Sequence, residues 1–93
     1  MPRRKLSKEE VEERIENAAN ILREIANSRL IPRNIRRTAE EAISFLYDEK
    51  YSPAVRVANA ISTLENVLYD PNMPPFARVK IWNAVSLLEP IRD

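Results

Sequence analysis

A run of glutamates near the start of this 93-residue chain is the first group of side chains that could do chemistry. Five carboxylates fall within eight residues, and carboxylate oxygens are the ligands that hard cations prefer: Glu9, Glu10, Glu12, Glu13 and Glu16. Helical di-iron sites, however, also use Glu-x-x-His pairs that point into the core, and the chain has no histidine. Acids are also favourable near the positive end of a helix dipole. The run therefore indicates a solvated helix face, and we expect no metal and no cofactor.

The basic residues form a second group. Residues 1–40 hold ten Lys or Arg against seven Asp or Glu, whereas residues 41–93 hold five against seven. If the N-terminal tail folds near the start of the second helix, one surface for nucleic-acid phosphates or for a partner would result. That surface would consist of Arg3, Arg4, Lys5, Arg33, Arg36 and Arg37. Alternatively, Arg36 and Arg37 only form salt bridges within their helix, with the glutamates four residues on. Both interpretations stay open.

The chain contains no histidine, no cysteine and no glycine. Without His or Cys, the Ser-His and Cys-His nucleophile pairs and the usual zinc sites are excluded. Without Gly, phosphate-binding loops and the dinucleotide-binding fingerprint are excluded, because only Gly readily adopts the backbone torsions they need. We therefore expect a protein with no enzymatic activity and no small-molecule substrate.

Membrane and export signals are also missing from the sequence. No apolar run is long enough to span a bilayer, and glutamates occupy the place where a signal peptide would need its apolar region. The lack of cysteine also excludes disulfides. These features predict a cytoplasmic protein that does not contact a membrane.

Helix start signals divide the chain into a basic tail over residues 1–6 and four helices. A capping box joins Ser7 to Glu10, and proline occupies or precedes the first turn of each later helix, where its missing N–H costs nothing. Apolar residues then recur at spacings of three and four. This pattern predicts helices over residues 8–27, 33–49, 53–69 and 74–89.

An internal repeat supports the same division. Shifting the chain by 42 residues gives nine identities over residues 14–46, more than chance would produce. The matched pairs are Arg14/Arg56, Asn17/Asn59, Ala18/Ala60, Leu22/Leu64, Pro32/Pro74, Arg36/Arg78, Ala42/Ala84, Ser44/Ser86 and Leu46/Leu88. The chain therefore reads as a duplicated helical hairpin.

The predicted fold is all-α, a four-helix bundle built from two tandem hairpins within a single domain over residues 1–93. The alternative is a two-unit stack of the HEAT type, whose repeat length is similar. Open stacks usually need at least three units to cover their apolar faces. We therefore favour the closed bundle.

The fourth helix carries more apolar residues than one bundle face needs. We predict that part of it is an oligomer face, formed by Ile81, Trp82, Val85 and Leu88. The leading hypothesis is thus a non-catalytic helical protein-interaction module that binds a protein partner or forms a homodimer. The alternative is an accessory protein of RNA or ribonucleoprotein that binds through the basic residues.

Three segments carry a resemblance to known proteins: Pro32–Arg37, Arg56–Ile61 and Asp70–Pro74. They resemble a small, mostly archaeal family of uncharacterised all-helical proteins, and the resemblance covers nearly the whole chain except its first few residues. It implies a four-helix domain in an archaeal cytoplasm. It implies no activity and transfers no functional residue.

Overall fold

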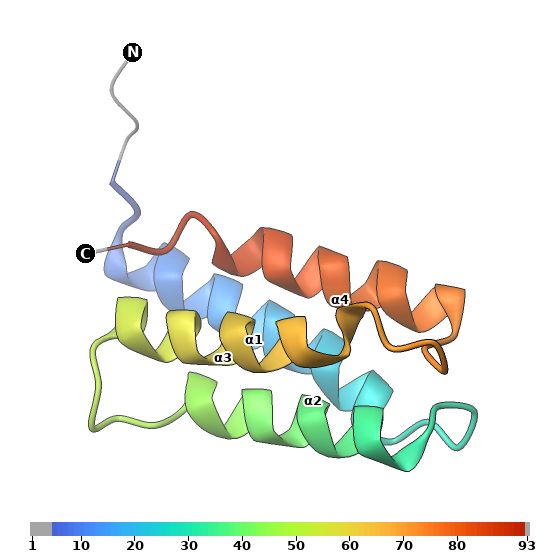
Figure 1. The fold of residues 1–93 in the computed structure, drawn as a ribbon. Coiled ribbons are helices and arrows are strands. Elements are labelled where there is room, and N and C mark those ends of the chain that lie inside the picture. The colour runs from blue at the N-terminus through green and yellow to red at the C-terminus, as the bar shows by residue number, and fades with distance from the viewer. Residues whose placement is uncertain (1–4, 93) are drawn as a thin grey trace.

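The computed structural model describes residues 5–92, which form four helices and no strand. The helices are α1 (Lys8–Ala26), α2 (Arg33–Leu46), α3 (Pro53–Leu68) and α4 (Pro75–Leu88). They run up and down alternately, so that the α1–α2 and α3–α4 connections lie at one end of the molecule and the α2–α3 connection lies at the other (Figure 1). The prediction of an all-α four-helix bundle made of hairpins is confirmed.

Local side-chain chemistry sets where the helices begin. The Ser7 hydroxyl accepts from the Glu10 N–H at 3.1 Å, and the Glu10 carboxylate accepts from the Ser7 N–H at 3.0 Å, so the predicted capping box is present. Ser52 caps α3 with Pro53 as its first residue, while Pro32 and Pro74 precede α2 and α4. Proline is suited to these positions because the first N–H groups of a helix have no partner within it.

The three connections between helices use one kind of turn. In each turn, the backbone carbonyl of the first residue accepts a hydrogen bond from the backbone N–H of the residue three positions later. The side-chain oxygen of that first residue accepts a hydrogen bond from the N–H two positions later. The turns begin at Ser28, Asp48 and Asp70. The Asp48 turn ends α2 at Leu46, three residues before the predicted end, because the Asp side chain offers the backbone an alternative to the helix.

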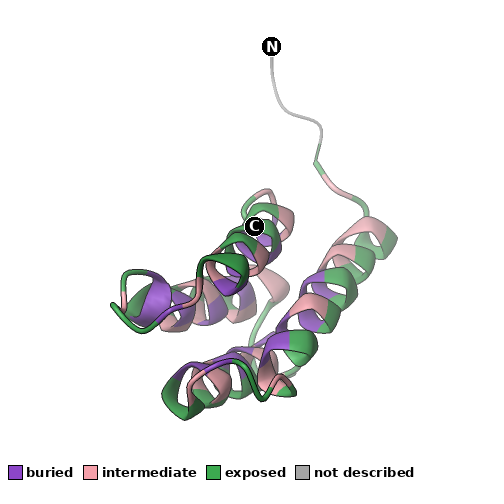
Figure 2. Cartoon of the chain, turned by 90° about the vertical axis from the view of Figure 1, so that its right-hand side faces the viewer, coloured by how far each residue is buried: buried purple, intermediate pink, exposed green. Residues whose placement is uncertain are grey.

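The core follows the 42-residue repeat. Figure 2 shows the buried positions of the helices turned toward the interior of the bundle. The equivalent buried pairs in α1 and α3 are Ile15/Val57, Ala18/Ala60, Leu22/Leu64 and Ile25/Val67. Those in α2 and α4 are Ile35/Ala77, Ala39/Ile81, Ala42/Ala84 and Leu46/Leu88. The two hairpins therefore bury the same positions, although the residues at several of them differ.

Arginine side chains close the ends of three helices. Arg14 Nη1 donates to the Leu87 carbonyl at the end of α4 over 3.1 Å. Its repeat equivalent, Arg56, donates through Nη1 to the Leu46 carbonyl at the end of α2 over 3.2 Å. Arg78 Nε donates to the last carbonyl of α3 over 2.9 Å. The last carbonyls of a helix lack partners within it and lie at the negative end of its dipole. Each arginine therefore provides both a hydrogen-bond donor and a favourable positive charge.

Packing between the helices is uneven. Helix α2 packs closely against both α1 and α3, and α4 packs closely against α1, whereas α3 and α4 touch much less. The segment after α4 returns to the start of α1, with Ile91 buried among the ends of the helices. No helix in residues 5–92 is long and apolar enough to cross a membrane.

Candidate interaction surfaces

The structure separates the basic residues that the sequence suggested as one surface. Arg3 and Arg4 lie outside the described residues. Lys5 is exposed at the end of the bundle where α1 begins, whereas Arg33 and Arg37 are exposed near the start of α2, at the opposite end (Figure 1). The two ends are about one length of α1 apart, roughly 28 Å at 1.5 Å per residue. Lys5 therefore does not join the basic residues of α2 in one patch.

Arg36 lies in a different environment from its neighbours. Its side chain is half-buried, and its Nε is buried with no hydrogen-bond acceptor among residues 5–92. Its repeat equivalent, Arg78, binds the end of α3. The position therefore belongs to the interior side of the hairpin, and Arg36 is not part of an exposed basic surface.

Burial also corrects the predicted oligomer face. Ile81 and Leu88 are fully buried, and Val85 is 3% exposed, because all three pack into the core of the bundle. A second subunit cannot reach them while the bundle is folded. Of the four predicted residues only Trp82 is exposed, at 41% of its surface.

The exposed side of α4 is nevertheless apolar. Phe76 is 45% exposed and Val79 is 60% exposed. Together with Trp82 they follow a spacing of three residues along the helix, and Asn83 and Ser86 are exposed beside them. We call this surface the α4 outer face and define it as Pro75, Phe76, Val79, Trp82, Asn83 and Ser86. None of its residues carries a charge.

The equivalent face of α2 shows that the fold does not require this apolar surface. The 42-residue shift places Asn34, Arg37 and Glu40 at the positions of Phe76, Val79 and Trp82, and all three are exposed. Phe76 and Val79 were not among the residues predicted from the sequence to form this surface. The internal repeat could have predicted them, because a charged residue in the first hairpin indicates that the equivalent position of the second hairpin faces outward.

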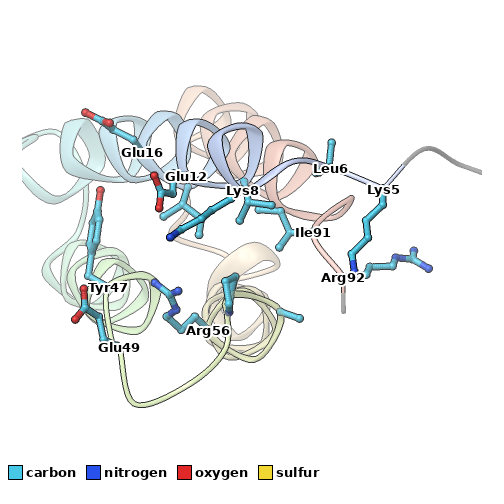
Figure 3. Close-up of a pocket in the computed structure, with 14 residues that line it drawn as sticks. Lys5, Leu6, Lys8, Glu12, Glu16, Tyr47, Glu49, Arg56, Ile91 and Arg92 are labelled. Carbon is cyan, nitrogen blue, oxygen red and sulfur yellow. The ribbon is translucent and has the colours of Figure 1, made fainter.

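A groove lies between the start of α1, the start of α3 and the C-terminal segment. Its volume is about 610 Å³ (Figure 3). Val11, Ile15 and Ile91 contribute apolar lining. The charged residues around it are Lys5, Lys8, Arg56 and Arg92 on one hand and Glu12, Glu16 and Glu49 on the other. Figure 3 shows Glu16 and Tyr47 toward one end and Lys5 with Arg92 toward the other. Since both signs of charge are present, the groove favours neither anions nor cations as a class.

The acidic residues do not assemble a cation site. Within residues 5–92, no group of three or more His, Cys, Asp or Glu side chains is arranged to hold a metal ion. Glu9, Glu12, Glu13 and Glu16 are exposed along α1.

Comparisons with known proteins agree on one family. A family model described as "Uncharacterised protein family (UPF0147)" matches residues 2–91. A UPF0147 protein of Desulfurococcus amylolyticus is 49% identical over 82 residues, covering 88% of this chain and 90% of that protein. One from Aeropyrum pernix is 52% identical over the same length, with coverage of 88% and 90%.

Two solved structures share the fold. A crystal structure of a protein of unknown function has a TM-score of 0.86 and 38% identity, covering 98% of this chain and 100% of that one. A UPF0147 protein from Thermoplasma acidophilum has a TM-score of 0.81 and 26% identity, covering 87% and 95%. The resemblance inferred from sequence is confirmed. The chain belongs to the uncharacterised protein family UPF0147.

Proposed function

We propose that this protein is a non-catalytic helical module that binds another protein through the α4 outer face. The observation that carries the proposal is the exposure of Phe76, Val79 and Trp82 on a face without charge. Buried centres of protein interfaces are enriched in aromatic residues and depleted in charged ones. Large aromatic residues in such positions also supply much of the binding energy.

The internal repeat strengthens this argument. Exposed apolar residues scattered singly are normal on protein surfaces and need no explanation. Here three of them line one face of α4, while the same positions of α2 carry Asn34, Arg37 and Glu40. Since the same repeat positions of α2 are exposed and polar, an outward position of this kind does not need an apolar residue, and we attribute the apolar residues of α4 to binding.

The composition of the chain supports a function without catalysis. The chain has no His or Cys to act as a base or nucleophile at neutral pH. The groove in Figure 3 is lined by carboxylates, amines, guanidinium groups and the Tyr47 side chain, and its lining residues include no serine, threonine or cysteine. A cytoplasmic location belongs to the same proposal, since it suits a binding module without disulfides.

The RNA alternative receives less support. Binding to nucleic acid depends mainly on clustered cations that neutralise several phosphates. Lys5 and the pair Arg33 and Arg37 lie at opposite ends of the bundle, and Arg36 is half-buried. No aromatic residue is interleaved with the exposed arginines of α2 to stack on bases.

The test compares the wild type with a variant whose α4 outer face copies that of α2. The triple variant Phe76→Asn, Val79→Arg, Trp82→Glu should fold, because the repeat tolerates the same residues. Both proteins are tagged and recovered, after chemical cross-linking, from a lysate of an archaeon that has a protein of this family, with and without RNase. The proposal expects a cross-linked protein that depends on the α4 outer face and survives RNase. A variant that recovers every protein the wild type does would refute it, and partners lost on RNase treatment would favour the RNA alternative.

A further inference from the structure

The second hairpin differs from the first in charge far more than in its core. Residues 8–46 contain 15 charged side chains, whereas residues 53–88 contain five. The only charged residues of α4 are Arg78 and Lys80, and both are engaged within the molecule. Arg78 donates to the end of α3, and Lys80 forms an ion pair with Glu24 of α1. The α4 outer face therefore presents no charge to a partner.

A face without charge is compatible with itself. When two copies of a chain meet about a two-fold axis, the same patch lies on both sides of the contact. Any charge near that axis then faces the same charge, which opposes association. The outer face of α2, with Arg37 at its centre, would meet this repulsion. The α4 outer face, with Val79 at the equivalent position, does not.

The spacing of residues on α4 is also symmetric. Phe76 and Trp82 lie three residues before and three residues after Val79, and Pro75 and Asn83 lie four residues before and after it. Positions three and four apart share one side of a helix. If two such helices pack antiparallel with Val79 at the centre, each Phe76 lies opposite a Trp82. Aromatic side chains in contact with each other favour offset or edge-to-face arrangements.

We propose that the partner bound by the α4 outer face is a second copy of this chain, with the two α4 helices antiparallel and Val79 on the two-fold axis. This inference rests on the proposed function, because it identifies the occupant of the same face. Each dimer contains two aromatic pairs, in which Phe76 contacts the partner's Trp82. The flanking Asn83 and Ser86 lie beside these pairs and remain partly hydrated.

The expected interface is small. Helix α4 has 14 residues and is about 21 Å long at 1.5 Å per residue. One pair of such helices buries less than the ~800 Å² per partner of a standard stable interface. We therefore expect a reversible dimer whose population rises with concentration in the micromolar range, rather than an obligate one.

Cysteine cross-linking tests the position of the axis directly, because the chain has no cysteine of its own. A residue on a two-fold axis lies beside its own copy, so a Val79→Cys variant should form a disulfide-linked dimer under mild oxidation. The matched control is Arg37→Cys, at the equivalent exposed position of α2. The proposal expects mostly dimer for the first variant and mostly monomer for the second. Equal cross-linking of the two variants would overturn it.

A charge pair provides an independent test in solution. Val79→Glu and Val79→Lys should each be monomeric by sedimentation equilibrium, since like charges meet at the axis. Their equimolar mixture should regain dimer to at least the wild-type fraction, because opposite charges then meet. Circular dichroism of each variant checks that both are folded. A mixture that stays monomeric while the wild type dimerises would place the contact elsewhere and overturn the proposal.

The outcome also separates this inference from the proposed function. A wild type that remains monomeric at every concentration, yet still cross-links to a different protein through the α4 outer face, would overturn the second-copy proposal and leave the interaction module standing. If the face captures no protein of either kind, both proposals fail together.

Discussion

Replacing Arg78 by methionine tests whether the arginines at the helix ends stabilise the bundle. The Arg78 Nε donates to the Leu68 carbonyl over 2.9 Å, and Leu68 itself is 1% exposed. Methionine retains most of the apolar stem that arginine packs along the helix. The substitution therefore removes the hydrogen bond and leaves a sheltered carbonyl without its donor.

The magnitude follows from the kind of bond that is lost. A hydrogen bond from a charged donor contributes about 1.5–3 kcal/mol to stability. Because Arg78 is half-buried, some solvent screening applies, and we expect a loss near the lower part of this range, about 2 kcal/mol. At ~4–8 °C per kcal/mol for a chain of this size, the melting temperature should fall by about 8–16 °C.

Arg36→Met is the matched comparison, since Arg36 is the repeat equivalent of Arg78. Its Nε is buried without an acceptor among residues 5–92. Replacing Arg36 therefore breaks no hydrogen bond made by this nitrogen. We expect a change below about 1 kcal/mol, because loss of packing is offset by relief of a buried unpaired donor. Arg37→Met, on the exposed side of α2, should lie within about 0.5 kcal/mol of the wild type.

Urea and thermal unfolding, followed by circular dichroism at 222 nm, would rank the three variants. Unfolding should be measured at one low protein concentration, so that self-association does not contribute. We expect Arg78→Met to be clearly the least stable of the three variants. An equal loss for Arg36→Met would refute it, by showing that the two repeat positions make the same bond. An unchanged Arg78→Met would show that the bond to Leu68 contributes nothing.

Three further substitutions probe the core, a helix cap and the surface. Leu64→Ala removes a fully buried side chain and should lower the free energy of unfolding by about 2–5 kcal/mol, measured by urea unfolding; a loss below about 1 kcal/mol would contradict its place in the core. Ser7→Ala removes the hydroxyl that binds the Glu10 N–H and should cost about 1 kcal/mol, with faster amide exchange confined to the first turn of α1. Lys80→Met breaks the ion pair between Lys80, which is 41% exposed, and Glu24, which is 62% exposed. The free energy of unfolding should change by less than about 0.5 kcal/mol. A larger, salt-dependent loss in thermal unfolding would show that the ion pair stabilises the fold.

Most of the fold was predictable because its signals are local. The capping box at Ser7 and the proline before or at each later helix start depend only on neighbouring residues. The end of α2 was predicted three residues late. Asp48 held the missing signal, since a short polar side chain that binds a nearby backbone N–H competes with helix continuation.

The inward side of α4 could not be read from periodicity alone. Apolar residues lie on nearly all sides of this helix, so spacing does not distinguish Ile81 in the core from Val79 on the surface. The repeat resolves the ambiguity. Ile81 corresponds to Ala39, which is buried, whereas Val79 corresponds to Arg37, which is exposed.

The placement of the basic residues depended on topology rather than on local sequence. In an antiparallel hairpin, the second helix begins at the end where the first one finishes. The tail before α1 and the start of α2 therefore lie one helix length apart, which separates Lys5 from Arg33. The predicted basic surface was wrong because residues 1–40 are basic as a stretch of sequence, whereas the fold places their charges at opposite ends of the bundle.

Comparison of the two hairpins separates residues that the fold needs from residues that it does not. Features that both copies share are those that the fold needs, such as the buried pair Leu22 and Leu64 or the arginines that close helix ends. Features found in only one copy are free of that constraint. The outer faces of α2 and α4 are formed by equivalent positions of the 42-residue repeat, yet one is charged and the other is not. Selection for folding alone gives no reason for that difference, whereas a binding surface on α4 does.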